Sequence, residues 1–179
     1  MTKPVENGHY IEAEIFSLAT MPQYACLFLS EINGNRVIPL WIGQEEADSI
    51  RMNLSGILPP RPLAHDLISA LIKKSGFSLR DVCINDVDKK VFFAYLFLQK
   101  KSGRKIESFK LDARPSDAIA VALRYGCPIF IHENVFEKAR VFLKPISEEE
   151  VRKFKTEINN LKPSDIIDSL SMKKSRRLE

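Results

Sequence analysis

The feature that most constrains the fold is a junction in which a strand pattern gives way to a strongly apolar helix. Residues 109–112 alternate between apolar and charged side chains, which is the two-residue period of a strand. Pro115 suits the first turn of a helix, because a backbone N–H at that position has no partner within the helix. Residues 118–123 are all apolar, and a helix that is apolar all round belongs in a core. The chain must therefore bury this helix inside the protein.

The same junction gathers chemistry-bearing side chains, namely Asp112, Arg114 and Asp117. A helix start offers free backbone N–H donors and the positive end of the helix dipole, and both favour anions. A neighbouring arginine can hold a phosphate or a carboxylate through two parallel hydrogen bonds. The pattern therefore indicates a candidate anion site. In the alternative interpretation, Asp117 or Ser116 caps the helix and Arg114 pairs with Asp112.

Hydrophobic periodicity and turn residues predict the other elements. We predict strands at 10–18, 24–32, 36–42, 79–87, 91–98, 105–112 and 128–131, and helices at 44–54, 63–75, 115–125 and 134–139. Pro39 removes a ladder hydrogen bond, which places its strand at an edge or gives it a bulge. Residues 91–98 are apolar on both faces and predict a central strand covered on both sides. The buried stripe predicted for helix 63–75 consists of Leu63, Leu67, Ile68, Leu71 and Ile72.

These elements predict an α+β fold, with a mixed, largely antiparallel sheet, helices packed on it and a helical C-terminal extension. The chain has 179 residues and 45% hydrophobic content, which suffices for one well-buried domain and an appendage. We place the domain at residues 1–145 and the extension, with its basic tail, at 146–179. Beyond Pro145 the composition becomes charged and helical, and Ser147 with Glu150 forms a capping-box pattern.

Charge and hydropathy limit the partners that this chain can have. The net charge is +4, but residues 172–179 carry +3 of it and leave +1 for residues 1–171. A nearly neutral body argues against nonspecific binding of duplex DNA as the main role. No apolar run approaches the roughly 20 residues that cross a bilayer, and residues 1–9 have no signal-peptide core. We therefore predict a cytoplasmic protein without a membrane partner, with Cys26, Cys83 and Cys127 as small core residues.

Three motifs, in this order, closely resemble the bifunctional nuclease domain family. They are Ile38-Pro39-Leu40-Trp41-Ile42-Gly43 with Glu45-Glu46-Ala47, then Arg61-Pro62-Leu63-Ala64-His65-Asp66-Leu67, then Asp112-Ala113-Arg114-Pro115-Ser116-Asp117-Ala118-Ile119-Ala120. The resemblance covers residues 10–140 and is to a bacterial member without the appended C-terminal helical-hairpin module. One departure is Ala64, where the family usually has a hydroxyl residue. The resemblance implies self-association, with a dimer favoured, and activity on DNA and RNA.

Phosphodiester hydrolysis needs an activated water, compensation for charge on the phosphoryl oxygens and protonation of the leaving oxygen. Carboxylates that hold Mg²⁺ or Mn²⁺ can supply the first two, because these ions favour oxygen ligands. A histidine titrates near neutrality and suits the role of acid or base. The candidates are Asp66, Asp112 and Asp117 for catalysis and for the metal, His65 as general acid or base, Arg61 and Arg114 for the phosphate, and more weakly Glu45 and Glu46.

Each assignment has a structural alternative. His65 and Asp66 can cap their helix or pair across an oligomer interface, and the two glutamates can simply favour the helix dipole. The sequence therefore leaves two functions open: a metal-dependent nuclease for DNA and RNA, and a noncatalytic anion-binding, assembly or regulatory module. The nuclease needs His65, Asp66, Asp112 and Asp117 around one open cleft. The module instead expects these groups to be paired and buried.

Overall fold

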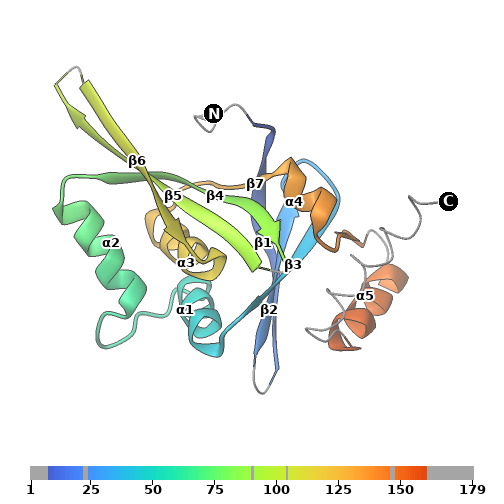
Figure 1. Ribbon diagram of the computed structural model, residues 1–179. Helices are drawn as coiled ribbons and strands as arrows, with labels where there is room; N and C mark the ends of the chain where they lie inside the picture. Colours follow the sequence, from blue (N-terminus) through green and yellow to red (C-terminus); the bar gives the residue numbers. More distant parts are fainter. Residues whose placement is uncertain (1–7, 22–23, 90, 104, 146–147, 161–179) are drawn as a thin grey trace.

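The computed structural model describes residues 8–21, 24–89, 91–103, 105–145 and 148–160 (Figure 1). Within them, one mixed sheet has the strand order β6-β5-β4-β7-β1-β2-β3-β8, with β4 and β7 parallel and the other pairs antiparallel. The predicted α+β fold is confirmed. The elements are β1 (Tyr10–Thr20), β2 (Ala25–Glu31), β3 (Arg36–Ile42), α1 (Gln44–Leu54), α2 (Ala64–Lys74), β4 (Ser78–Asp88), β5 (Val91–Ser102), β6 (Lys105–Ala113), α3 (Pro115–Tyr125), β7 (Ile129–His132), α4 (Glu133–Lys138), β8 (Phe142–Leu143) and α5 (Glu148–Asn160).

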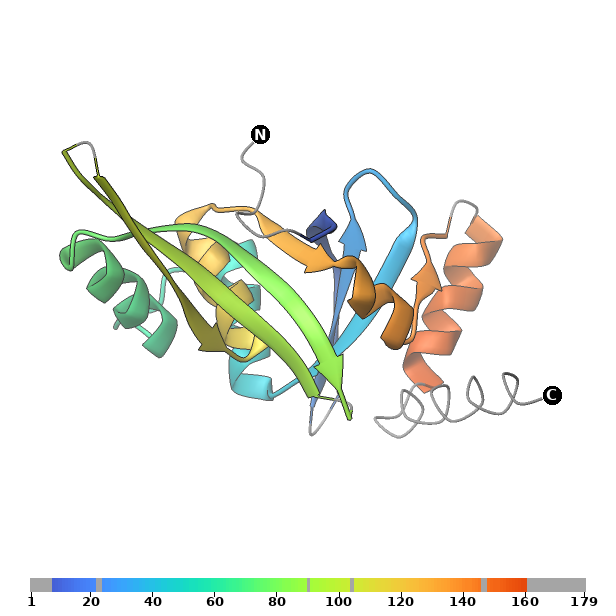
Figure 2. The same cartoon turned by 45° about the horizontal axis from the view of Figure 1, so that its top comes forward.

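Helix α3 is the centre of the helix layer, as its apolar sequence predicts. Its residues 118–122 are at most 1% exposed and belong to the main core between the sheet and the helices. Helices α1 and α2 contact α3, and α3 contacts β4 and β5 (Figure 2). The helix begins with Pro115 in its first turn and ends at Gly126, which adopts the left-handed conformation at φ 66°. This packing brings the first turns of α2 and α3 close together.

The strand of Pro39 is not the edge strand of the described sheet, since the short β8 lies beyond it, but Pro39 lies in the part of β3 that has a described neighbour on one side only. Strand β3 pairs with β2 along its length, and Pro39 lies opposite Phe28. On its other side, β3 pairs with β8 only at Arg36 and Val37. The missing N–H of Pro39 therefore falls where no described strand needs it.

The prediction that residues 91–98 form a strand covered on both sides was wrong. Strand β5 is next to the edge strand β6, and Val91 and Phe93 near its start are exposed. Figure 2 shows α1, α2 and α3 behind the strands β4 to β6, whose outer face carries no described helix. Phe97 is nevertheless buried, because it packs in an apolar cluster with Cys83 and Phe130 and the cations of Arg80 and Lys110 lie over its ring. Charged side chains thus replace a second helix layer.

The buried stripe predicted for α2 was also wrong. Leu67 and Ile68 are exposed and Leu71 is 68% exposed, whereas the buried residues of the helix are His65 and Ser69. The reason is a polar network that turns the opposite face of α2 toward α1 and α3. The exposed side forms what we name the α2 apolar surface. It consists of Leu54, Ile57, Leu58, Leu67, Ile68 and Leu71.

The C-terminal part agrees with the sequence as far as the structure describes it. Helix α5 occupies the segment for which a capping box was predicted. The further helix expected after Pro163 and the basic tail lie outside the described residues. Cys26 and Cys83 are buried free thiols and Cys127 is partly buried, as predicted. Within the described ranges, no helix has the length and hydropathy to span a bilayer.

Candidate active site at the first turns of three helices

Each helix of the layer carries a carboxylate at its third position. These residues are Glu46 in α1, Asp66 in α2 and Asp117 in α3. Backbone N–H groups in the first turn have no partner within the helix, and the helix dipole favours negative charge there. Arg114 pairs with both Glu46 and Asp117, whereas Asp66 pairs with Arg124 in the last turn of α3. The start of α2 is joined to that of α3 by the contact between His65 and Asp117.

Asp117 is the residue through which most of these contacts pass. Arg114 donates from Nε to Asp117 Oδ2 at 2.7 Å and from Nη2 to Oδ1 at 3.1 Å, and it donates to Glu46 Oε1 at 2.6 Å. The Arg114 side chain is 68% exposed, so the guanidinium is open to solvent. Burial alone would raise the pKa of Asp117, but hydrogen bonds from Arg114 and His65 outweigh it and hold that pKa below its ordinary value.

The alternative pairing of Arg114 with Asp112 is therefore wrong, since the guanidinium contacts Asp117 and Glu46 instead. The reason lies in the α3 start. Arg114 is the N-cap residue, and a side chain there reaches the residue three positions on.

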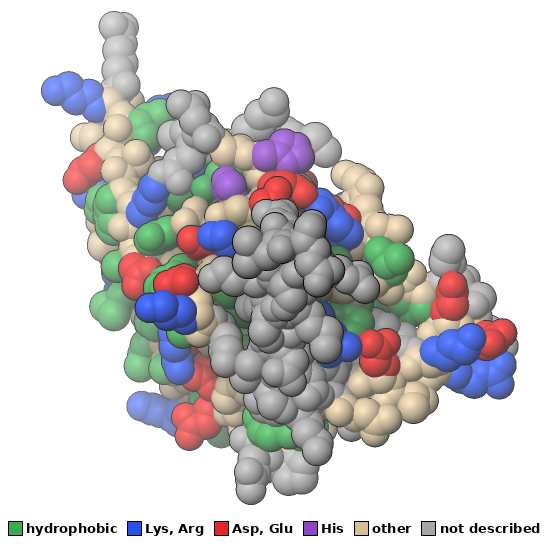
Figure 3. Space-filling view, turned by 45° about the vertical axis from the view of Figure 1, so that its right-hand side comes forward, with side chains coloured by type: hydrophobic (Ala, Val, Ile, Leu, Met, Phe, Trp, Pro, Cys, Tyr) green, Lys and Arg blue, Asp and Glu red, His purple; other side chains and the backbone are tan. Residues whose placement is uncertain are grey.

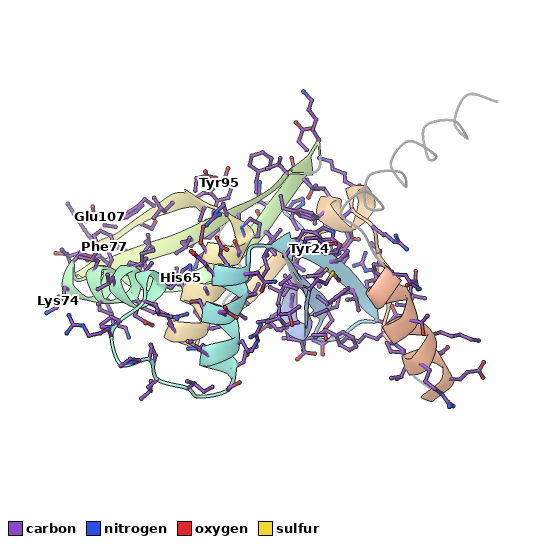
Figure 4. All side chains as sticks on the ribbon, turned by 90° about the horizontal axis from the view of Figure 1, so that it is seen from below. Tyr24, His65, Lys74, Phe77, Tyr95 and Glu107 are labelled. Atoms are coloured by element: carbon purple, nitrogen blue, oxygen red, sulfur yellow. The ribbon has the colours of Figure 1, made fainter. Side chains whose placement is uncertain are left out.

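His65 lies in the helix layer (Figure 4), and its ring contacts Asp117 of α3 and Ser49 of α1. Its Nε2 is 3.1 Å from Asp117 Oδ1, and its Nδ1 is 2.8 Å from Ser49 Oγ in α1. An ionised carboxylate only accepts hydrogen bonds, so we assign the hydrogen to Nε2, and in neutral imidazole Nδ1 then accepts from the Ser49 hydroxyl. The His65 side chain is only 10% exposed. His65 therefore has little contact with solvent of its own, and its effect on a bound water or substrate must pass through Asp117.

Arg124 connects the far side of the network. It donates from Nε to Asp66 Oδ1 at 2.5 Å and from Nη2 to Ser49 Oγ at 3.0 Å. Asp66 Oδ2 also accepts from the Leu63 N–H at 2.7 Å, which confirms the capping role proposed as its alternative. Burial would raise the pKa of Asp66, but the bonds from Arg124 and Leu63 lower it below its ordinary value. This carboxylate holds α2 in place.

Sequence reasoning missed Ser49 and Arg124 and gave Glu46 too little weight. Ser49 lies in mid-helix and belongs to no motif. Arg124 offered a usable signal, because it follows six apolar residues in a core helix and a cation there needs an anionic partner. The leucines dominate the pattern of helix 63–75, and this pattern does not indicate the polar contact that His65 of α2 makes with Asp117 of α3.

Two predicted residues stand apart from this network. Asp112 is exposed near the end of β6, and Arg61 is exposed in the loop before α2. In the described part of the chain, no hydrogen bond or ion pair joins either to another side chain. His65, Asp66 and Asp117 are thus brought together, while Asp112 and Arg61 are not. The three residues are paired with each other or with arginines, and His65 is nearly buried. The open cleft of four groups expected for the nuclease is therefore not formed, and the pairing is the arrangement expected for the module.

The arrangement does not fit the predicted metal ligands. No group of three or more His, Cys, Asp or Glu side chains among the described residues is placed to hold a metal ion. Asp66 and Asp117 instead face separate arginines, and Asp112 lies on the sheet. A requirement for Mg²⁺ or Mn²⁺ therefore stays a prediction, and the chemistry below uses no metal step.

Comparison with known proteins adds three findings. The family model described as "Bifunctional nuclease domain" matches residues 27–144. An uncharacterized protein of Mycobacterium tuberculosis is 40% identical over 148 residues, which are 78% of this chain and 86% of that protein. Bifunctional nuclease 2 of Oryza sativa subsp. japonica is 29% identical over 114 residues, which are 64% of this chain and 35% of that protein. Bifunctional nuclease 1 of Arabidopsis thaliana is 26% identical over 112 residues, which are 63% of this chain and 34% of that protein.

Proposed function

This chain belongs to the bifunctional nuclease domain family, and from that premise we propose that it hydrolyses phosphodiester bonds of DNA and RNA. The names of the plant relatives support a nuclease-like role. The observation that carries the proposal is the exposed Arg114 guanidinium, which bridges Asp117 and Glu46. A guanidinium that binds two carboxylates has the geometry to bind a phosphate in their place.

The proposed reaction begins when a backbone phosphate takes Arg114 from Asp117. Asp117 then loses donors that lower its pKa, so it becomes a better base while the His65 Nε2–H still holds it. Asp117 accepts a proton from the attacking water as the new P–O bond forms. The bond to the leaving oxygen breaks, and this oxygen takes a proton from solvent. Arg114 stabilises the charge on the phosphoryl oxygens. Arg61, which stands apart from the network, has no assigned part in this step.

The direct test is cleavage of labelled single-stranded DNA and RNA by the native chain with Mg²⁺, with Mn²⁺ or with a chelator. We expect cleavage to persist in the chelator, because Asp117 and Arg114 do the proposed chemistry without an ion. Cleavage that disappears in the chelator and returns with either ion would contradict this and support the metal ligands predicted from sequence. Native protein without cleavage in any arm would refute the nuclease proposal.

A second candidate is an assembly module, and the α2 apolar surface favours it. Monomeric proteins rarely expose contiguous apolar patches of more than a few hundred Å² unless they mark an interaction site. The six exposed side chains of this surface come from α2, the end of α1 and the loop between them. We propose that a second copy of the chain packs here, which agrees with the predicted dimer. This candidate does not exclude hydrolysis, since Arg114 lies on α3.

We expect Leu71→Glu to weaken self-association by at least tenfold, since a carboxylate in an apolar interface loses its hydration. Sedimentation velocity over a range of protein concentrations measures this. Leu143→Glu is the matched control, because Leu143 is similarly exposed on β8, away from the α2 apolar surface. Equal association of the native chain and the Leu71→Glu variant would remove this surface as the interface.

Figure 3 bears on how nucleic acid would be held. Basic and acidic side chains lie next to each other on the face that it shows, as expected for a nearly neutral body. Broad electrostatic attraction is therefore weak on this face, and local groups must supply the affinity.

A further inference from the structure

The outer face of the sheet, opposite α1 to α3, contains a cavity of about 290 Å³ over β4, β5 and β6. Its walls include Arg80, Phe97, Gln99, Ser108 and Lys110. In the β5–β6 ladder, Phe97 lies opposite Lys110 and Gln99 lies opposite Ser108, so these four side chains share one face. We name this the outer-face cavity. Neither hydrolysis nor the core explains its polar lining.

The outer-face cavity combines cations with aromatic rings. The Arg80 guanidinium carbon is 5.0 Å from the centre of the Phe97 ring, and Lys110 Nζ is 5.6 Å from it. Lys110 Nζ is also 5.4 Å from the centre of the Tyr95 ring, which lies on the strands away from the helices in Figure 4. Aromatic rings beside cations are the means by which proteins bind unpaired bases and the phosphates that link them.

Positive charge is concentrated at this place. The body of the chain is nearly neutral, but residues 99–112 contain five lysines and arginines and only two acidic residues. The segment therefore carries a net charge of +3, but only part of it faces the cavity. Lys101 and Lys110 share the face of Phe97, whereas Lys100 lies on the other face and contacts Ser75 and Phe77. Asp81 is buried and accepts from the Arg80 Nε, so its charge is paired. The exposed carboxylate of Asp112 lies on the same face as Phe97, opposite Tyr95.

Arg80 has unused hydrogen-bonding capacity at the cavity wall. Its side chain is 13% exposed, and within the described residues its Nη2 has no hydrogen-bond partner. A buried donor without a partner is unfavourable and uncommon in native proteins. Nη2 itself is buried, so the Arg80 side chain would have to turn toward the cavity for an anionic oxygen there to provide the missing acceptor.

The outer-face cavity and Arg114 lie on opposite sides of the sheet, and a bound strand would pass around the edge strand β6 to reach both. Lys110 precedes Arg114 by four residues, which corresponds to about 13 Å along an extended chain. One strand of stacked nucleic acid rises about 3.4 Å per nucleotide, so about four nucleotides span this distance. We propose that the outer-face cavity binds a backbone phosphate of single-stranded nucleic acid, with an unpaired base against Tyr95. Its placement relative to the cleaved bond rests on the proposed function.

The test is the binding of a fluorescently labelled 12-nucleotide single-stranded DNA, measured by anisotropy without regard to cleavage. Lys110→Gln should weaken binding about tenfold at about 50 mM salt and lower the slope of log affinity against log salt by about one. Lys74→Gln is the matched control, because Lys74 is an exposed cation at the end of α2. A DNA hairpin with a minimal loop should lose less affinity on Lys110→Gln than the single strand does, because its paired bases cannot stack on Tyr95 and so cannot hold a phosphate at Lys110.

Separate results keep the two proposals apart. Binding that depends on Lys110 in a protein that cleaves nothing would support the cavity and refute the nuclease. Equal effects of Lys110→Gln and Lys74→Gln, or an equal loss for hairpin and single strand, would overturn the cavity proposal. A Lys110 effect on the binding of inorganic phosphate alone, with oligonucleotide binding unchanged, would overturn it as well. Arg80→Gln, with its fold verified by circular dichroism, should reproduce the loss.

Discussion

Asp117→Asn is expected to lower the rate of DNA and RNA cleavage by a factor of about 100 or more, which is the usual contribution of a positioned general base. The amide cannot accept the proton of the attacking water, and it no longer offers Arg114 an ionised partner. Because Asp117 acts on the chemical step, we expect kcat to fall more than KM rises. Single-turnover cleavage of a labelled strand measures the effect. Asp48→Asn is the matched control, since Asp48 is an exposed α1 residue paired only with Arg51 among the described side chains.

His65 is expected to act as a positioning residue in the same reaction, because its Nε2–H holds Asp117 and its ring is nearly buried. His65→Ala should therefore lower kcat and shift the acid limb of the pH–rate profile upward, since Asp117 loses a hydrogen bond that lowers its pKa. Equal residual cleavage by the native chain, Asp117→Asn and His65→Ala would point to a contaminating enzyme and defeat the assignment.

Arg124→Leu is expected to lower the free energy of unfolding by about 3 kcal/mol, the lower part of the range for breaking a buried ion pair. The substitution leaves Asp66 without its guanidinium partner and removes a hydrogen bond to Ser49. Urea denaturation at neutral pH measures the change. Arg51→Leu is the control, because this half-exposed arginine forms a surface pair and should change stability by no more than about 0.5 kcal/mol. A loss below 1 kcal/mol for Arg124→Leu would contradict the role of the network.

The same variant should alter the response to acid. The folded pKa of Asp66 is below its ordinary value of 3.8, so the ion pair stabilises the native chain above that pH. This stability is lost as the pH falls through the folded pKa, because protonation removes the charge that Arg124 binds. At pH values below about 4, the urea concentration at the unfolding midpoint of the native chain should therefore decrease. Arg124→Leu should show a smaller drop, because its Asp66 no longer gains from ionisation.

The sequence predicted the elements well where the signal was local. The helix at 44–54 and the helix that begins at Pro115 have the predicted bounds, and the one-sided strand pairing at Pro39 followed from one missing donor. The two errors share a cause. The leucine stripe of α2 and the apolar run of β5 show which faces are apolar but not which of them another element covers.

The candidate site shows the same division. The motifs placed His65, Asp66, Arg114 and Asp117 at helix starts, and folding brings these starts together. The arginine partners could not be assigned from spacing, since Arg124 and Asp66 are 58 residues apart and meet only because α2 crosses α3. Ser49 joined the network for the same reason.

By itself, the sequence determined the family, the order of elements, the buried α3 and the residues that bring charge to the helix starts. These follow from periodicity, capping and motif order, which act over a few neighbouring residues. Only the tertiary structure decided that α2 turns its leucines outward, that Arg114 binds Asp117 rather than Asp112, and that Arg80 and Lys110 border a common cavity. Those outcomes depend on the angle and rotation at which the elements pack. An unpaired buried charge is strongly unfavourable, so pairing of charges between helices decides which faces turn inward.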